Sequence, residues 1–231
     1  ETTNRPIIAL GREHSIAEPC FPIIAGHGHV VRLLEKTDID YVFVANAINS
    51  ETDFPQTESW FCPWGQTLPL VLKNSLMDEG WRRRLLAPVI RFRDGEASVE
   101  ASLFDMAKKF GVSRKRHRRA VRWAYAAQRA FQRDLQEAGR QALQTLRQNR
   151  RPAIVLVGRA YNLYDPGLNL NIPAKLREVY GIDVLPMDFV PFQGIDISTW
   201  HENMFWNYGR KILQTAAWMA EQKDLHLIYL T

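Results

Sequence analysis

The sequence contains very little cysteine, and Cys20 and Cys62 are its only two thiols among 231 residues. Secreted proteins more often carry several paired cysteines, so this scarcity argues against a disulfide-stabilised secreted protein. No run of eighteen apolar residues occurs, which excludes a transmembrane helix. No basic segment followed by an apolar one indicates secretion. We therefore expect a cytoplasmic protein with reduced thiols.

The two ends of the sequence indicate a fragment of a longer protein. It begins with Glu1-Thr2-Thr3 and lacks an initial Met, and its last apolar run, 225–230, has the character of a strand that ends as it leaves a sheet. Functional groups often lie on the loops that follow such strands. We expect further residues on both sides.

Positive charge is concentrated in one segment. Residues 105–151 contain fourteen Lys or Arg and three Asp or Glu, a net charge of +11, whereas the remainder has a net charge of −6. The cluster RKRHRR at 114–119 could neutralise the phosphates of a nucleic acid, but no nucleic-acid-binding motif surrounds it. We favour a solvated helix face or a patch for an acidic protein partner, and a salt-dependent shift with DNA or RNA would identify a nucleic-acid binder instead.

Short apolar runs rich in β-branched residues alternate with helical patterns, which is typical of an α/β sheet with right-handed crossovers. The runs have the length and composition of buried parallel strands. We predict strands at 6–10, 40–46, 153–158, 182–187 and 225–230, and helices at about 26–36, 67–79, 172–180 and 200–222.

The stretch 102–149 has a different pattern. Apolar residues from Ala124 to Leu146 recur every three or four positions, with arginines off this stripe, which predicts an amphipathic helix. It has more than thirty residues and is roughly 50 Å long at about 1.5 Å per residue. We predict two Rossmann-like parallel-sheet units, 1–80 and 152–231, joined by a helical connector with a basic face, 81–151.

One loop and a pair of histidines are candidates for chemistry. The loop 158–169 follows a predicted strand, where open α/β sheets bind ligands, but it matches neither the Walker nor the dinucleotide fingerprint. It is therefore either a helix-capping loop or a loop for a ligand or partner. His27 and His29 point in different directions on a helix, so they cannot readily share a metal. One of them could support a metal-bound thiol through a hydrogen bond, and the other would have a capping or core role.

The two cysteines allow three interpretations: a disulfide, two unrelated buried thiols, or part of a metal site. Cys20 follows the predicted strand 6–10, Cys62 follows the strand 40–46, and each precedes a helix. Both would then lie at one edge of the sheet, near helix N-termini that favour thiolates. Two thiolates do not complete a four-ligand site. Further ligands would come from His, another chain, an exogenous ligand or residues beyond the end.

Taken together, several motifs resemble the CoA-substrate-specific enzyme activase-related family, which is similar to the iron–sulfur subunits of 2-hydroxyacyl-CoA dehydratases and to double-cubane cluster proteins. The resemblance follows the chain in order over nearly its whole length. The motifs are CFP at 20–22, GHGH at 26–29, YVF at 41–43, CPWGQTLP at 62–69, GRAYN at 158–162, DPGLN at 165–169, MDF at 187–189 and FWNYG at 205–209.

The resemblance implies a [4Fe–4S] cluster with Cys20 and Cys62 as two of its ligands, and a third cysteine in a loop after the strand 225–230. The candidates for second-shell or loop roles are His27, His29, Arg159, Tyr161 and Asn162. Ala160 stands where the family usually has Pro, so the stiffness of this loop differs.

The resemblance further implies an electron-transfer component without a complete active site of its own. Its partners would be an ATPase activase, in the same or a separate chain, and a 2-hydroxyacyl-CoA dehydratase or related CoA-thioester reductase. The fragment by itself would bind the cluster poorly or not at all. The alternative is a cluster-free ligand-binding or protein-interaction domain on the same scaffold.

Overall fold

The structure is a computed structural model that describes residues 2–231. It has the mixed helices and parallel strands of the α/β class, in two compact units. The first unit comprises the residues up to Thr52 and Ser59–Arg122, and the second comprises Asp53–Glu58 and Trp123–Thr231. The helix α6 (Arg114–Asn149) contributes to both units. No helix within the described part of the chain is long and apolar enough to span a bilayer.

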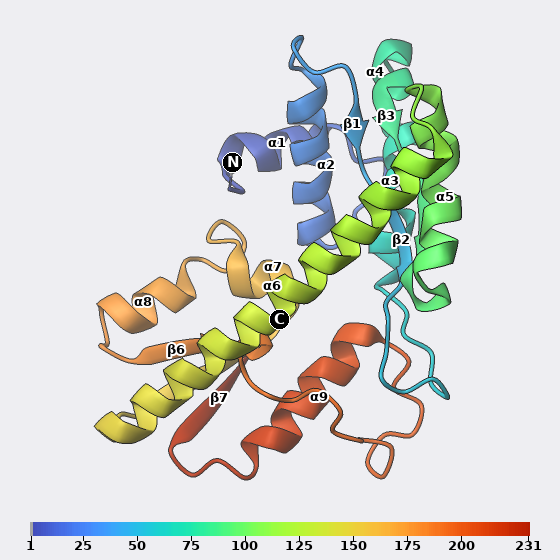
Figure 1. The fold of residues 1–231 in the computed structure, drawn as a ribbon. Helices are drawn as coiled ribbons and strands as arrows, with labels where there is room; N and C mark the ends of the chain where they lie inside the picture. The colour runs from blue at the N-terminus through green and yellow to red at the C-terminus, as the bar shows by residue number, and fades with distance from the viewer. Residues whose placement is uncertain (1) are drawn as a thin grey trace. The chain divides into compact units, whose positions relative to one another are not determined.

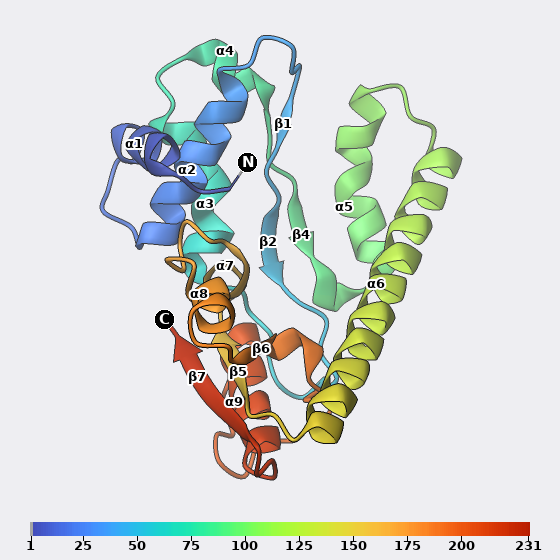
Figure 2. The ribbon, with the colours of Figure 1, turned by 90° about the vertical axis from the view of Figure 1, so that its left-hand side faces the viewer.

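The first unit contains a two-stranded parallel ribbon covered by helices (Figure 2). Hydrogen bonds from Val44 N to the Leu86 carbonyl and from Asn46 N to the Pro88 carbonyl link its two short ladders. The ladders pair β1 (Val42–Phe43) with β3 (Leu85–Leu86) and β2 (Asn46–Asn49) with β4 (Val89–Arg91). The helices are α1 (Arg5–Glu13), α2 (Phe21–Leu34), α3 (Pro63–Ser75), α4 (Glu79–Arg84), η1 (Phe92–Asp94) and α5 (Glu96–Lys109).

The predicted strand at 6–10 is wrong, because these residues form the helix α1. The side chain of Asn4 accepts a hydrogen bond from Ile7 N at 3.0 Å and caps the helix. Pro6 stands in the first turn, where the absence of an amide hydrogen costs nothing. The apolar run is short enough to suit either structure, and these start signals decide in favour of the helix.

The second unit contains a three-stranded parallel sheet of order β6-β5-β7 (Figures 1 and 2). The predicted strands 153–158, 182–187 and 225–230 are confirmed as β5 (Ala153–Gly158), β6 (Asp183–Pro186) and β7 (Leu225–Leu230). Every residue of β5 from Ala153 to Val157 is buried, as expected for the central strand. The other elements are α7 (Ala160–Tyr164), α8 (Ile172–Glu178), η2 (Met187–Phe189) and α9 (Asn207–Met219).

The predicted long helix is confirmed as α6, which has 36 residues. Its apolar stripe is only partly buried. Leu143 and Leu146 pack into the core beside β5, whereas Phe131 is 59% exposed. Gly139 permits a close crossing, since a Cβ there would lie 1.7 Å from the Phe189 carbonyl oxygen. Gly111, with φ of 70°, separates α6 from α5.

Candidate metal centre

Cys20 and Cys62 occupy equivalent positions in the first unit, because each is the N-cap residue of a helix. Cys20 precedes α2 and Cys62 precedes α3, and neither side chain makes a capping hydrogen bond. A proline in the first turn of each helix fixes the backbone without needing an amide donor. Both thiols are free, Cys20 exposed and Cys62 half-buried, so the structure contains no disulfide between them.

The arrangement agrees with one part of the sequence argument and corrects another. Both cysteines do precede helices, and a helix N-terminus favours negative charge. However, Cys20 follows the helix α1 and not a strand, so the two thiols do not lie at one edge of a sheet for the reason expected. Packing of α2 against α3 relates the two cysteines instead.

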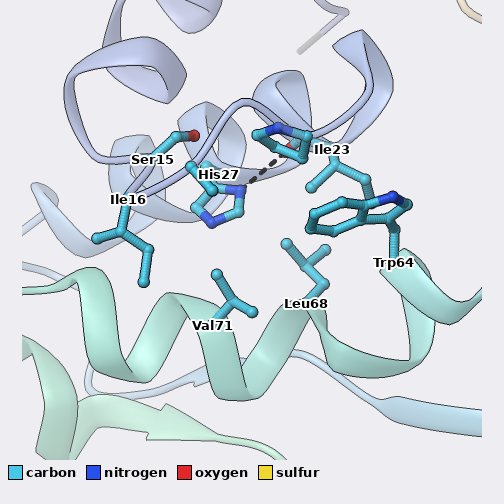
Figure 3. Close-up of a pocket in the computed structure, with 9 residues that line it drawn as sticks. Ser15, Ile16, Ile23, His27, Trp64, Leu68 and Val71 are labelled. Atoms are coloured by element: carbon cyan, nitrogen blue, oxygen red, sulfur yellow. Dashed lines mark hydrogen bonds between the residues drawn. The ribbon is translucent and has the colours of Figure 1, made fainter.

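A small pocket lies between α2 and α3, the two helices that Cys20 and Cys62 precede (Figure 3). Pro19, next to Cys20, lines it together with Trp64, two residues after Cys62. The cavity offers about 10 Å³ of space for the centre of a water-sized sphere, which is room for one water molecule. The remaining lining residues are mostly apolar: Ser15, Ile16, Ala17, Ile23, His27, Leu68 and Val71.

His27 is the one imidazole in the wall of this pocket, and it is fully buried. Its Nδ1 lies 2.9 Å from the Ile23 carbonyl oxygen. A carbonyl only accepts, so Nδ1 carries the proton and Nε2 carries a lone pair. Nε2 is buried and has no hydrogen-bond partner. Burial lowers the pKa of His27, the Ile23 hydrogen bond opposes this effect, and the charge of His14 adds to it.

His29 lies elsewhere, as expected for two histidines two positions apart on one helix. Its Nε2 is 2.9 Å from the Thr3 hydroxyl oxygen, and it does not line the pocket. Of the two histidines, only His27 therefore lines the pocket between α2 and α3.

The donor atoms fit an iron–sulfur group only in part. Thiolates are the usual protein ligands of iron–sulfur clusters, and the lone pair of His27 Nε2 could serve as a nitrogen ligand. Yet between residues 2 and 231 no three His, Cys, Asp or Glu side chains converge closely enough to hold a metal ion. The described residues thus supply two thiols for such a group, and not a complete ligand set.

The loop after β5 is held by its own polar contacts. Asn162 donates from Nδ2 to the Leu230 carbonyl at 3.1 Å, and Tyr164 donates from its hydroxyl to Asp188 Oδ2 at 2.8 Å. Burial and the nearby Asp188 raise the pKa of Tyr164. A Cβ on Gly158 would lie 2.5 Å from the Leu230 carbonyl oxygen, so only glycine fits there. The loop therefore joins the ends of β5 and β7.

The remaining candidates of this loop are spread along it. Arg159 is the N-cap of α7, and Tyr161 lies within that helix. The side chain of Asn169 accepts from Asn171 N at 3.0 Å, and Asn171 is the N-cap of α8. Neither N-cap side chain makes a capping hydrogen bond, so the helix-capping interpretation and a ligand role for Arg159 both stay predictions.

The basic cluster at 114–119 packs in part against α5. His117 is buried, with Nε2 2.8 Å from the Glu100 carbonyl, and Arg118 pairs with the Glu100 carboxylate at 3.2 Å. Arg114 lies over the Phe104 ring at 4.5 Å. Half of the cluster thus has a structural role, which weakens the case for a surface devoted to nucleic acid.

Sequence reasoning missed Arg210, a buried cation in the first turn of α9. Its exposed fraction is 6%, and Nη2 donates to the Glu58 carbonyl at 2.6 Å and the Met204 carbonyl at 2.7 Å. Its guanidinium also lies 5.8 Å from the centre of the Phe54 ring. Arg210 thereby fixes the segment 53–58, which precedes Cys62. No sequence signal marks it, because its partner carbonyl is 152 residues away.

Comparison with protein families gives one match over most of the chain. A family model described as CoA enzyme activase uncharacterised domain matches residues 1–190. These residues include both cysteines, the pocket, and the strands β5 and β6, but not α9 or β7. Neither the curated proteins nor the solved structures give a match.

Proposed function

The chain belongs to the CoA enzyme activase-related family, and we propose that it is part of an iron–sulfur electron-transfer component. In this proposal it acts in the cytoplasm with an ATP-dependent activase. It passes electrons toward a 2-hydroxyacyl-CoA dehydratase or a related CoA-thioester reductase. The observation that carries the proposal is that both cysteines are free N-cap residues of two helices, α2 and α3, which line one pocket.

Three features of the first unit support this role. The thiols of Cys20 and Cys62 are not engaged in capping hydrogen bonds and remain available as ligands. The positive ends of the α2 and α3 dipoles favour the negative charge of thiolates. Trp64 and Leu68 give the adjoining pocket apolar walls, and a low local dielectric tunes the potential of a redox group.

A bound cluster would supply one-electron chemistry, and Cys20 and Cys62 would hold it. The remaining ligands would come from residues outside 2–231 or from an exogenous molecule. Cys20 is exposed and Cys62 is half-buried, so such ligands could reach a cluster that the two thiols hold. The exposed arginines on α6, such as Arg129 and Arg133, would attract an acidic partner protein.

The absence of three converging ligands among the described residues favours one alternative. In this alternative the scaffold is a cluster-free domain that binds a small ligand or another protein. It predicts that iron and sulfide produce no visible absorption in the complete protein, and that both thiols stay reactive toward alkylating reagents after iron and sulfide are added.

The electron-transfer proposal is tested on the complete protein after anaerobic treatment with iron and sulfide. We expect an activase of the family, with ATP and a low-potential reductant, to produce the EPR signal of a reduced cluster. The same mixture with a non-hydrolysable ATP analogue is the control and should give no signal. Reduction that is equally fast without activase, or a signal that never forms, would contradict the proposal.

A further inference from the structure

The pocket between α2 and α3 has the features of a binding site in its own right. It is walled by two helices and by the segment that joins α1 to α2 (Figure 3). Two glycines hold α2 rigidly against α1, because a Cβ on Gly28 would lie 1.8 Å from the Ile7 carbonyl oxygen. A Cβ on Gly11 would lie 1.9 Å from the Ile24 carbonyl oxygen. His27 adjoins this crossing, and its Nδ1 is hydrogen-bonded to the Ile23 carbonyl.

The hydrogen-bonding capacity that His27 gives this wall is of one kind, and the Ser15 hydroxyl in the same wall already donates to the Gly11 carbonyl at 2.7 Å. Nδ1 of His27 is already committed to the Ile23 carbonyl, and the buried Nε2 has a lone pair without a partner. A buried acceptor left without a donor costs free energy. A group that donates one hydrogen bond at this point would remove that cost, whereas a second acceptor would not.

The other walls exclude ions. Ile23, Leu68 and Val71 are apolar and offer neither a charge nor a second ligand. Within the described chain no cluster of metal-ligating side chains includes His27. Burying an unpaired charge among such walls is costly, so a neutral donor suits the pocket better than a cation.

The dimensions of the pocket define the rest of the ligand. Its interior has room for one water-sized group. Two apolar side chains that line it also reach solvent, Ile16 with 66% of its surface exposed and Trp64 with 41%, so the edge of the pocket at these residues is apolar. A short aliphatic chain would lie along this edge with its terminal group inside.

We propose that this pocket binds the end of a short aliphatic alcohol or thiol, whose O–H or S–H donates to His27 Nε2. This inference stands apart from the iron–sulfur proposal, because it needs no bound cluster. His27 is a specificity residue here: it selects molecules that donate a hydrogen bond over molecules of equal size that do not.

The test uses the 231-residue chain labelled with ¹⁵N-histidine and two pairs of isomers. The first pair is 1-butanol and diethyl ether, and the second is 1-butanethiol and diethyl sulfide. We expect 1-butanol, 1-butanethiol or both to shift the His27 Nε2 resonance saturably. The ether and the sulfide, which lack the donor, should leave it unchanged. His29, which is paired with Thr3, is the internal control.

Two variants locate the response. His27→Phe removes both the acceptor and the reporting resonance, so its binding is followed by calorimetric titration; affinity for the active donor should fall about fivefold to tenfold, as expected for one hydrogen bond. Val71→Phe fills the cavity, keeps His27, and should abolish binding. It serves as the decisive variant if His27→Phe does not fold.

Three results would overturn the inference. The first is a free protein whose His27 carries its proton on Nε2. The second is an equal response to the alcohol and the ether, or no response to either donor. The third is unchanged binding in a folded Val71→Phe protein. A response to the alcohol alone assigns the site to hydroxyl ligands, and a response to the thiol alone assigns it to thiols.

Discussion

Replacing Arg210 with Met tests how the chain holds the segment that leads to Cys62. Met keeps the unbranched aliphatic stem and removes the guanidinium. The carbonyls of Glu58 and Met204 then lose donors at 2.6 and 2.7 Å. Hydrogen bonds to a charged group contribute roughly 1.5–3 kcal/mol each. Because the exposed fraction of Arg210 is only 6%, water cannot readily replace both donors. We expect the free energy of local opening of the segment 53–58 to fall by about 2–4 kcal/mol, allowing for partial solvation of the carbonyls.

Amide hydrogen exchange measures this loss where it occurs. The Thr57 amide donates to the Phe54 carbonyl at 3.0 Å inside the clamped segment. A local loss of 2–4 kcal/mol corresponds to exchange that is about 30-fold to 1000-fold faster. The Val155 amide in β5 reports global unfolding and provides the reference. Arg177→Met, which removes an exposed guanidinium from α8, is the matched control and should change neither amide.

The outcome shows whether Arg210 stabilises the segment 53–58 locally or only contributes to the stability of the whole fold. If exchange at Thr57 rises less than fivefold in Arg210→Met while the protein stays folded, the two carbonyl contacts do not stabilise the segment. If Thr57 and Val155 accelerate by the same factor, Arg210 contributes to overall stability alone. Either result would refute the reasoning.

Three further predictions concern stability and titration. Gly28→Ala places a Cβ 1.8 Å from a backbone oxygen of α1 and should lower the free energy of unfolding in urea by about 3 kcal/mol or more. Gly65→Ala, which meets open space, should not lower it, and equal losses would contradict the helix crossing. The lowered pKa of His27 means that the unfolded chain binds more protons between the folded-state pKa of His27 and about pH 6.5. The free energy of unfolding should therefore fall with decreasing pH in that window, by up to about 1.4 kcal/mol per pH unit, and less steeply in His27→Phe. If the free energy of unfolding has the same pH dependence in both proteins, His27 is not neutral in the folded state. Burial and the nearby Asp188 raise the pKa of both Tyr164 and Tyr208, so two tyrosines should ionise later than free tyrosine in an absorbance titration. Tyr164→Phe should reduce this late step and leave the part due to Tyr208, and a late step of unchanged size would argue against the assignment.

The second unit was largely predictable from the sequence because its strands are continuous apolar runs. β5 is buried throughout, so its sequence AIVLVG carries the composition of a central parallel strand. The run PIIAL misled the prediction, because five apolar residues suit a strand or one face of a helix. The deciding features were Asn4 and Pro6 as start signals, and the close crossing at Gly11 and Gly28.

The candidate site was predictable where it depends on local sequence and not where it depends on packing. Pro63 directly follows Cys62, and Pro22 stands two residues after Cys20. Prolines at these positions mark helix starts, so the N-cap positions of the two cysteines follow from the sequence. The unpartnered Nε2 of His27 depends on which side chains of α3 face α2. The contacts of Arg210 join segments more than a hundred residues apart. Neither leaves a periodic or compositional signal.

The most direct measurement of the central claim is the iron and sulfide content of the complete protein after anaerobic reconstitution, with ⁵⁷Fe Mössbauer spectra of the same samples. We predict equal amounts of bound iron and sulfide and the spectrum of a cubane cluster. The content should fall sharply in Cys20→Ala and in Cys62→Ala, and remain in His29→Ala. Iron content and spectra that are unchanged in both cysteine variants would contradict the account.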